Sequence, residues 1–285
     1  MNEKNAVIGG ALYLVATPIG NLSDITERAK KVLSEVSFIA AEDTRNSLKL
    51  LSAYGIHAEL VSYFEHNKKA SGERIIERLK NGESCALITD AGMPAISDPG
   101  EDMVALCAKY EIPVFVIPGA CAAVSALALS ALPTSRFCFE GFLPPKPNQR
   151  KKALEALSAE ERTMIFYEAP HKLKATLADM AEIFGSERRI SLSRELTKLN
   201  EQTLRLTLGE ALEYYEISEP RGEYALVVEG GEKRNEGTEL SALSPREHVE
   251  HYIALGMTKK DAIKAAARDR GVSKSEIYSA VIDEV

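Results

Sequence analysis

Short apolar runs alternate with longer amphipathic stretches through the first half of the chain. The runs have the length of strands, whereas the stretches between them carry apolar residues at the three- and four-residue spacing of helices. This alternation predicts β-α-β units that close into a mostly parallel sheet. Asp24 and Glu27 form a capping box that predicts one helix start. The predicted strands are 12–16, 37–41, 59–62, 84–89 and 113–117, and the predicted helices are 24–36, 44–54, 71–80, 101–110 and 120–131.

The pattern changes near Leu132-Pro133, which predicts a domain boundary. Strands dominate beyond it, and a proline-rich basic loop ending at Lys152 separates the first two of them. We therefore expect an α/β domain (1–132), an α+β domain (133–231), and a linker with a helical tail (232–285). The predicted strands of the second domain are 137–142, 163–167, 190–194, 203–208 and 224–229, and its predicted helices are 171–184 and 210–215.

The tail contains two successive capping boxes, Thr258 with Asp261 and Ser273 with Glu276, separated by a glycine turn. This spacing resembles a helix-turn-helix. Residues 257–275 carry six basic and two acidic side chains, which favours contact with nucleic acid. The alternative is an ordinary helical hairpin with a solvated charged face. The basic candidates here are Lys259, Lys260 and Lys264.

Composition narrows the function without deciding it. The chain has 45% apolar and 27% charged residues, which is typical of a folded globular protein. Its net charge of −7 disfavours nucleic-acid binding over the whole surface, although residues 1–240 carry all of this charge and leave local basic elements possible. The four cysteines lie far apart without metal-ligand spacing, so we expect no metal site and reduced thiols in the cytoplasm. Gly9 and Gly10 interrupt the only signal-like stretch, and no run is long enough to span a membrane.

Three loops after predicted strands are rich in small residues, at 17–21, 90–100 and 118–120. Ligands of open parallel sheets bind at the carboxyl ends of the strands, where these loops lie. None of them matches a phosphate-binding motif, which disfavours a nucleotide with a pyrophosphate. S-adenosylmethionine fits better, with Asp90 binding its ribose hydroxyls. The alternative is that these glycines and prolines only form tight turns.

Polar residues also cluster at strand ends. Glu42-Asp43-Thr44-Arg45 follows the second strand, where two carboxylates and an arginine would face the same crevice, although Thr44 with Asp43 is also a plausible helix start. In the second domain, Glu168 and Lys172 flank His171, and a polar turn spans 195–198.

Five blocks of sequence carry a specific resemblance: ATPIGNLSDIT (16–26), AEDTR (41–45), DAGMPAISDPG (90–100), YEAPH (167–171) and RELTK (194–198). In this order they closely resemble the ribosomal RNA small subunit methyltransferase I family of the tetrapyrrole methylase superfamily. The resemblance implies a two-domain tetrapyrrole methylase-like α/β fold, that of a class III methyltransferase, with a small C-terminal helical region. It also implies a homodimer, with S-adenosylmethionine bound between the two domains.

The activity implied by the resemblance is 2'-O-methylation of a cytidine ribose in the decoding region of 16S rRNA. The first loop lacks the GxGPG of the tetrapyrrole enzymes, which favours a different methyl acceptor, and Met93 replaces the smaller polar residue common in relatives. The cofactor-binding residues implied are Asp90, Ala91, Gly92, Met93, Pro94, Pro118, Gly119, Ala120, Tyr167 and Pro170, with the turn at 221–223 nearby.

A ribose hydroxyl is weakly acidic, so a carboxylate within hydrogen-bond reach would help to remove its proton during methyl transfer. Asp43 and Glu42 are the first candidates for this role, with Arg45 orienting a substrate phosphate or pairing with them. Replacing Asp43 by Asn is therefore expected to abolish turnover while sparing cofactor binding.

An acidic protein that acts on RNA needs local basic elements. The predicted RNA contacts are Lys146, Arg150, Lys151 and Lys152, together with the three tail lysines. The partner would be free 16S rRNA or an assembled small subunit, and deleting the tail is expected to weaken RNA binding more than cofactor binding. Two other functions remain open: a methyltransferase acting on a porphyrinogen or precorrin, and a non-catalytic RNA-binding regulator.

Overall fold

The computed structural model describes residues 6–231, 240, 243–270 and 272–282. The predicted linker that begins at residue 232 therefore lies largely outside the described residues. Two compact units divide the chain, one formed by residues 1–155 and 162–229 and the other by 156–161 and 230–285. The boundary predicted at residue 132 falls inside the first unit and stays a prediction. Within the described ranges, no helix is both long and apolar enough to cross a membrane.

The first half forms a parallel sheet with strand order β3-β2-β4-β1-β5, as the alternating pattern predicted. Its central strands are buried on both faces because helices cover each of them. Helices α1 and α2 pack on one face around Leu33, Ile39 and Leu51, and α3 and α4 pack on the other around Phe38, Ile75 and Met103. The strands are β1 (Leu12–Val15), β2 (Phe38–Ala41), β3 (Leu60–Ser62), β4 (Cys85–Ile88) and β5 (Val114–Ile117), and the helices are α1 (Glu27–Glu35), α2 (Thr44–Ala53), α3 (Lys68–Lys80), α4 (Glu101–Lys109) and α5 (Ala122–Leu129), with a 3-10 turn η1 at Leu22–Asp24.

The first helix starts later than its sequence predicted. Asp24 ends η1, and the Thr26 side chain caps α1 by accepting a hydrogen bond from the Ala29 amide at 3.1 Å. The predicted capping box of Asp24 with Glu27 is therefore wrong, because Thr26 lies nearer the helical residues and provides the cap.

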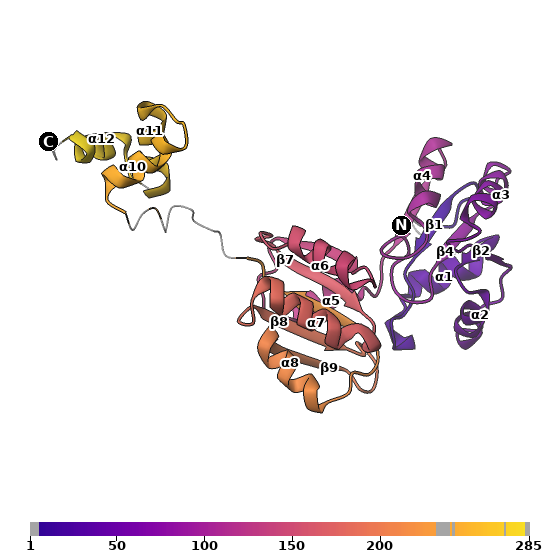
Figure 1. The fold of residues 1–285 in the computed structure, drawn as a ribbon. Helices are drawn as coiled ribbons and strands as arrows, with labels where there is room; N and C mark the ends of the chain where they lie inside the picture. Colours follow the sequence, from indigo (N-terminus) through magenta and orange to yellow (C-terminus); the bar gives the residue numbers. More distant parts are fainter. Residues whose placement is uncertain (1–5, 232–239, 241–242, 271, 283–285) are drawn as a thin grey trace. The chain divides into compact units, whose positions relative to one another are not determined.

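The second half forms a mixed sheet with strand order β6-β7-β10-β8-β9. Strand β6 runs parallel to β7, while the other neighbours are antiparallel. Figure 1 shows α6, α7 and α8 across one face of this sheet, and α5 contacts β7, β8 and β10. The strands are β6 (Phe137–Phe142), β7 (Thr163–Glu168), β8 (Arg189–Arg194), β9 (Gln202–Thr207) and β10 (Tyr224–Val228), and the helices are α6 (Pro147–Ala156), α7 (Pro170–Phe184) and α8 (Leu208–Ile217).

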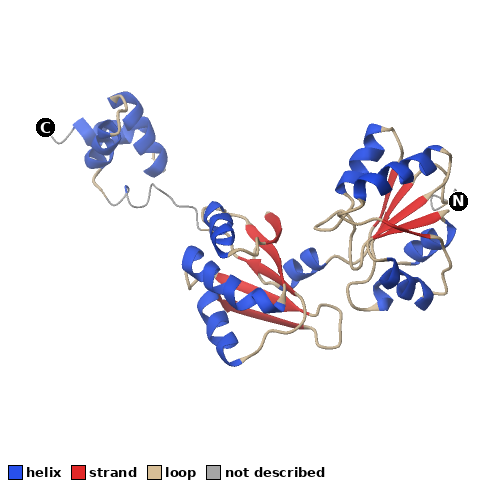
Figure 2. Ribbon diagram, turned by 45° about the vertical axis from the view of Figure 1, so that its right-hand side comes forward, coloured by secondary structure: helices blue, strands red, loops and turns tan. Residues whose placement is uncertain are grey.

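Two elements depart from the predicted layout. Most of the predicted basic loop, from Pro147 onward, is helix α6, with the proline at its start where the missing amide proton costs nothing. Helix α5 follows the last strand of the first sheet, yet Ala123, Ala126 and Leu127 pack against Ile165 and Val227 of the second sheet. Figure 2 shows the strands of the two sheets with helices packed against each of them.

The tail consists of α10 (Pro245–Ala254), α11 (Lys259–Arg270) and α12 (Lys274–Ile282). Its core contains Val249, Ala262, Ile263, Ala266 and Ile277. Both predicted helix starts are present: the Thr258 hydroxyl accepts from the Asp261 amide, and the Ser273 hydroxyl accepts from the Glu276 amide, each at 3.3 Å. The two predicted helices are therefore confirmed, whereas the glycine turn predicted between them, at Gly271, lies outside the described residues.

Candidate active site

The carboxyl ends of the first sheet carry the three loops rich in small residues. Thr17, just after β1, forms an isolated antiparallel bridge with Gly92, with backbone hydrogen bonds of 2.9 and 3.1 Å. Gly92 adopts a φ of +84°, and a Cβ there would lie 3.3 Å from the Ile19 side chain. Glycine at this position therefore lets the loop after β4 lie directly against the loop after β1.

The loop after β4 is held in an uncommon backbone conformation. Ala95 and Ser97 have φ values of +67° and +61°, which cost free energy in residues with a side chain. A Cβ at Gly100 would lie about 3 Å from the Leu87 side chain and from Ala95. The tight turn at Gly100 returns the chain to α4 and leaves Asp98 facing a cavity.

Three of the carboxylates that line this cavity come from the first sheet: Glu42 from the end of β2, and Asp90 and Asp98 from the loop after β4. Burial, followed by the negative charge of Glu42, raises the pKa of Asp98 from 3.8 to about 6, and Asp90 adds to the rise. The pKa of Glu42 is raised by burial, then by the charges of Asp90 and Asp43. Like charges held in a partly desolvated site favour a bound cation or a shared proton.

The second half of the chain supplies the opposite wall. The Tyr167 hydroxyl, at the end of β7, accepts a hydrogen bond of 3.0 Å from the Ala123 amide in the first turn of α5. Its ring packs against Phe139 and Phe142, with centroids 5.1 and 5.5 Å away. Burial raises the pKa of Tyr167 to about 12, so the hydroxyl stays protonated and does not act as a base at neutral pH.

Glu168, beside Tyr167, has a structural role. It is buried, and its carboxylate accepts hydrogen bonds from the Thr176 hydroxyl at 2.6 Å and the Ala169 amide at 2.9 Å. Both carboxylate oxygens are therefore occupied by α7 and its start. His171 is exposed and does not border the cavity.

The polar turn at 195–198 closes the cavity on a third side. The Lys198 ammonium lies 3.0 Å from Glu195 and 3.6 Å from Glu223. A Cβ at Gly20 would lie 2.4 Å from Lys198 Cγ and 2.9 Å from the Leu196 carbonyl oxygen. Gly20 therefore lets the loop after β1 lie close against the turn at 195–198.

The cavity formed by these walls has a volume of about 470 Å³, within the range of small-molecule sites. Among the described residues, no group of three or more His, Cys, Asp or Glu side chains is arranged to hold a metal ion. The residues that line the cavity come from both halves of the first unit: Ile19, Glu42, Asp90, Ala91, Gly92, Met93, Ile96, Ser97, Asp98, Cys121, Ala122, Phe142, Tyr167, Glu168, Ala169, Ser193, Glu195, Leu196, Lys198, Glu223, Tyr224 and Ala225.

Half of the cofactor residues predicted from sequence border this cavity, namely Asp90, Ala91, Gly92, Met93 and Tyr167. The other five do not line it. Gly119 instead packs closely on the residue that follows β1, since a Cβ there would lie 2.9 Å from that of Ala16. The remaining ones are Pro94, Pro118, Ala120 and Pro170.

Asp43 and Arg45 also lie outside the lining and pair with each other. Asp43 caps α2 by accepting from the Arg45 amide at 2.8 Å, and it accepts two hydrogen bonds from the guanidinium, at 2.9 and 3.2 Å. These contacts lower the pKa of Asp43 to about 2. The choice of Asp43 as first candidate for the base stays a prediction, although its carboxylate is already engaged by Arg45 and by the start of α2.

Some of the predicted RNA contacts are exposed, whereas others are buried or paired with a carboxylate. Arg150 is buried, and its guanidinium Nε donates to Asp179 at 2.7 Å, so this prediction is wrong. Lys151 lies 2.6 Å from Glu182 and is partly neutralised. Lys146 and Lys152 are exposed near the start of α6. Lys259, Lys260 and Lys264 are exposed on α11.

Sequence reasoning missed Asp98 as a site residue, although it lies in the same loop as Asp90. Proximity to Asp90 was the available signal, but the reversal that turns Asp98 toward the cavity depends on Ala95, Ser97 and Gly100. Ser193 and Cys121 were missed as well, because they reach the cavity only when the two sheets meet.

Solved tetrapyrrole methyltransferases share this α/β fold. The model of the family Tetrapyrrole (Corrin/Porphyrin) Methylases matches residues 11–212. A uroporphyrin-III C-methyltransferase from Thermus thermophilus, solved with S-adenyl homocysteine, superposes with a TM-score of 0.55 at 14% identity, over 76% of this chain and 96% of its own.

Relatives with similar sequences define the family more narrowly than the fold does. The chain is 53% identical to ribosomal RNA small subunit methyltransferase I of Halalkalibacterium halodurans, over 95% of this chain and 94% of the relative. It is 50% identical to the protein of the same name from Bacillus subtilis, with the same coverage. The chain therefore belongs to the ribosomal RNA small subunit methyltransferase I family, within the tetrapyrrole methylases.

Proposed function

We propose that this chain is an S-adenosylmethionine-dependent methyltransferase that methylates the 2'-hydroxyl of a cytidine ribose in the decoding region of 16S rRNA. The observation that carries the proposal is the convergence of Glu42, Asp90 and Asp98 on one cavity with walls from two sheets. The names of its relatives support the choice of small-subunit rRNA as substrate.

The cavity residues fit the cofactor chemically. Asp90 is exposed beside Asn46, whose amide donates to it at 2.9 Å, and is free to accept from ribose hydroxyls. Ala91, Gly92 and Ala122 leave room for a planar base, and the surrounding carboxylates suit a cationic sulfonium. When bound, S-adenosylmethionine supplies an electrophilic methyl group, whose bond to sulfur breaks as a bond to the ribose oxygen forms.

The chain's own task is to orient the ribose hydroxyl, exclude water and accept one proton. We assign the proton to Asp98, which lines the cavity and is half-buried. With a pKa of about 6 it is mostly ionised at neutral pH, yet it is a far better base than Asp43. The negative charge of Glu42 raises the pKa of Asp98. It therefore favours the protonated Asp98 that forms as the ribose oxygen gains the methyl group.

The proposed RNA contacts of the second sheet lie at and just before α6. Lys146 and Lys152 are exposed there, whereas buried Arg150 fixes the helix to α7 through Asp179. With an rRNA substrate, the enzyme would act in the cytoplasm. Its substrate would be free 16S rRNA or an assembled small subunit.

A homodimer is part of the proposal. Strand β5 is an edge strand of the first sheet, and Phe115 and Val116 on it are 40% and 52% exposed. An edge strand with exposed apolar side chains is a surface at which a second copy can add.

The decisive assay gives methyl-labelled S-adenosylmethionine and the purified chain three acceptors separately: small ribosomal subunits, free 16S rRNA and a porphyrinogen. Label in the RNA, resistant to alkaline cleavage at one cytidine, is expected. Label in the porphyrinogen alone would overturn the proposal in favour of a tetrapyrrole methyltransferase. Cofactor and RNA binding without transfer to any acceptor would favour a non-catalytic regulator.

A further inference from the structure

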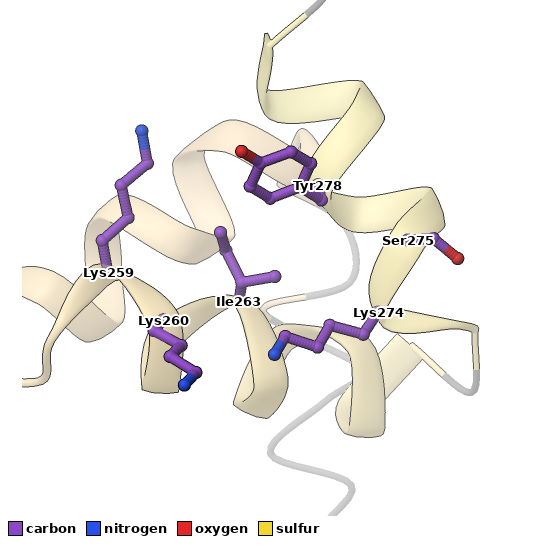
Figure 3. A pocket seen from close by; sticks show the side chains of 6 residues that line it. All are labelled: Lys259, Lys260, Ile263, Lys274, Ser275 and Tyr278. Carbon is purple, nitrogen blue, oxygen red and sulfur yellow. The ribbon is translucent and has the colours of Figure 1, made fainter.

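A groove lies in the tail, between α11 and α12, and has a volume of about 670 Å³ (Figure 3). Four of its six lining residues come from the first turns of the two helices: Lys259 and Lys260 from α11, and Lys274 and Ser275 from α12. Figure 3 shows the Tyr278 ring over Ile263, with the Lys259 and Lys260 side chains extending to opposite sides of α11.

The three lysines give this groove an uncompensated positive charge. Within the described part of the chain, no ion pair involves Lys259, Lys260 or Lys274, whereas Lys151, Lys174 and Lys198 each lie within 3.0 Å of a carboxylate. A lysine in the first turn of a helix also opposes the helix dipole. Helix stability therefore does not explain these three charges.

Tyr278 adds a second kind of contact. Its side chain is 54% exposed although it borders the groove, and Ile263 beneath it is 3% exposed and belongs to the tail core. An exposed aromatic ring on a firmly packed helix, flanked by lysines, is the arrangement on which unpaired nucleic-acid bases stack.

We propose that this groove binds a single-stranded segment of the substrate RNA, with one unpaired base stacked on Tyr278 and the adjacent phosphates on Lys259, Lys260 and Lys274. The inference rests on the proposed function and specifies how the tail recognises its substrate. RNA is favoured over an acidic protein segment because such a segment would use the lysines but has no comparable need for an exposed ring.

The test uses the full chain and a fluorescent single-stranded RNA of twelve nucleotides, with affinity measured by anisotropy over a range of salt concentrations. Tyr278→Ala is expected to weaken binding roughly tenfold, and Tyr278→Phe to restore it. Replacing the three lysines by Gln is expected to reduce the salt slope by about 2. Tyr110→Ala and Lys109→Gln, in the first unit, are the matched controls and should bind as wild type.

Circular dichroism of each variant establishes that the tail helices remain. Unchanged RNA affinity and salt slope in the folded variants would overturn the proposal. The proposal would also be overturned if the folded variants lost binding to a fluorescent polyglutamate peptide but kept their affinity for RNA. A methyl-transfer assay on small subunits tests the proposed function separately from the groove. If the wild-type protein transfers no methyl group to RNA, the proposed function is wrong, and the binding measurements alone decide whether the groove binds RNA. In an active enzyme, the groove variants should raise KM for subunits and leave kcat unchanged.

Discussion

The guanidinium of Arg150 and the carboxylate of Asp179 form an ion pair with a 2.7 Å contact, and both side chains are nearly inaccessible to water, at 6% and 11% exposure. The pair joins α6 to α7 on one face of the second sheet (Figure 1). Removing Arg150 would leave the buried Asp179 carboxylate with only its longer, 3.7 Å contact to Lys151, which is more costly than losing a surface pair.

Arg150→Ala should therefore destabilise the protein by about 3–5 kcal/mol, as measured by urea unfolding. Lys152→Ala, one residue beyond Lys151 and exposed, is the stability control and should change unfolding by less than about 0.5 kcal/mol. An Arg150→Ala protein as stable as wild type would show that the pair contributes nothing to α6 packing.

The hydrogen bond from the Ala123 amide to the Tyr167 hydroxyl gives a second prediction. Tyr167→Phe leaves this amide without its acceptor at the start of α5, beside the cavity wall formed by Cys121 and Ala122. We expect a several-fold weaker affinity for S-adenosylmethionine by calorimetry, since a lost buried hydrogen bond costs about 1 kcal/mol. Tyr110→Phe, far along the chain, should bind normally, and an equal affinity for the two variants would contradict the prediction.

Activity should depend on pH through Asp98. Its carboxylate accepts a proton only when ionised, so kcat should fall as pH drops through about 6. Glu42→Gln removes a negative charge that raises the pKa of Asp98, and should move this acidic limb to lower pH. A limb at the same pH in both proteins would show that Asp98 does not control it.

The same shift has a consequence for stability. Because the pKa of Asp98 is raised in the folded state, the folded protein binds this proton more tightly than the unfolded chain, and it loses stability as pH rises from 3.8 through about 6. Asp98→Asn removes that cost, so its Tm at pH 7.5 should be a few degrees above that of wild type. A lower Tm would show instead that the charged carboxylate stabilises the loop.

The exposed edge of β5 predicts the effect of a charge at the proposed dimer contact. Val116→Lys should convert dimers to monomers in analytical ultracentrifugation. Ile217→Lys is the control, because Ile217 is 91% exposed at the end of α8, on the second sheet. Dimers that persist in Val116→Lys would place the contact elsewhere.

The first sheet and the tail were predictable because their patterns are local. Buried runs such as Cys85–Ile88 and the caps at Thr258 and Ser273 need no knowledge of distant residues. Helix α6 was predicted as a loop because its prolines and basic residues resemble a linker, and the partner that buries Arg150 is 29 residues further along the chain.

The active site was predicted only in part for the same reason. Asp90 follows a strand directly, so its position follows from the sheet alone. Asp98 reaches the cavity because Ala95 and Ser97 have left-handed backbone conformations. Alanine and serine rarely adopt this conformation, so the sequence does not predict it. The difference between Asp43 and Asp98 as bases depends on Arg45 and on burial, which only the folded structure determines.

The most direct test of the account compares kcat for Asp98→Asn and Asp43→Asn on small ribosomal subunits at pH 7.5, with cofactor affinity measured for both. The account predicts that Asp98→Asn lowers kcat at least about a hundredfold with cofactor affinity largely kept. Asp43→Asn, which can still cap α2, should retain most of its turnover. Full turnover by Asp98→Asn, or loss of turnover confined to Asp43→Asn, would contradict it.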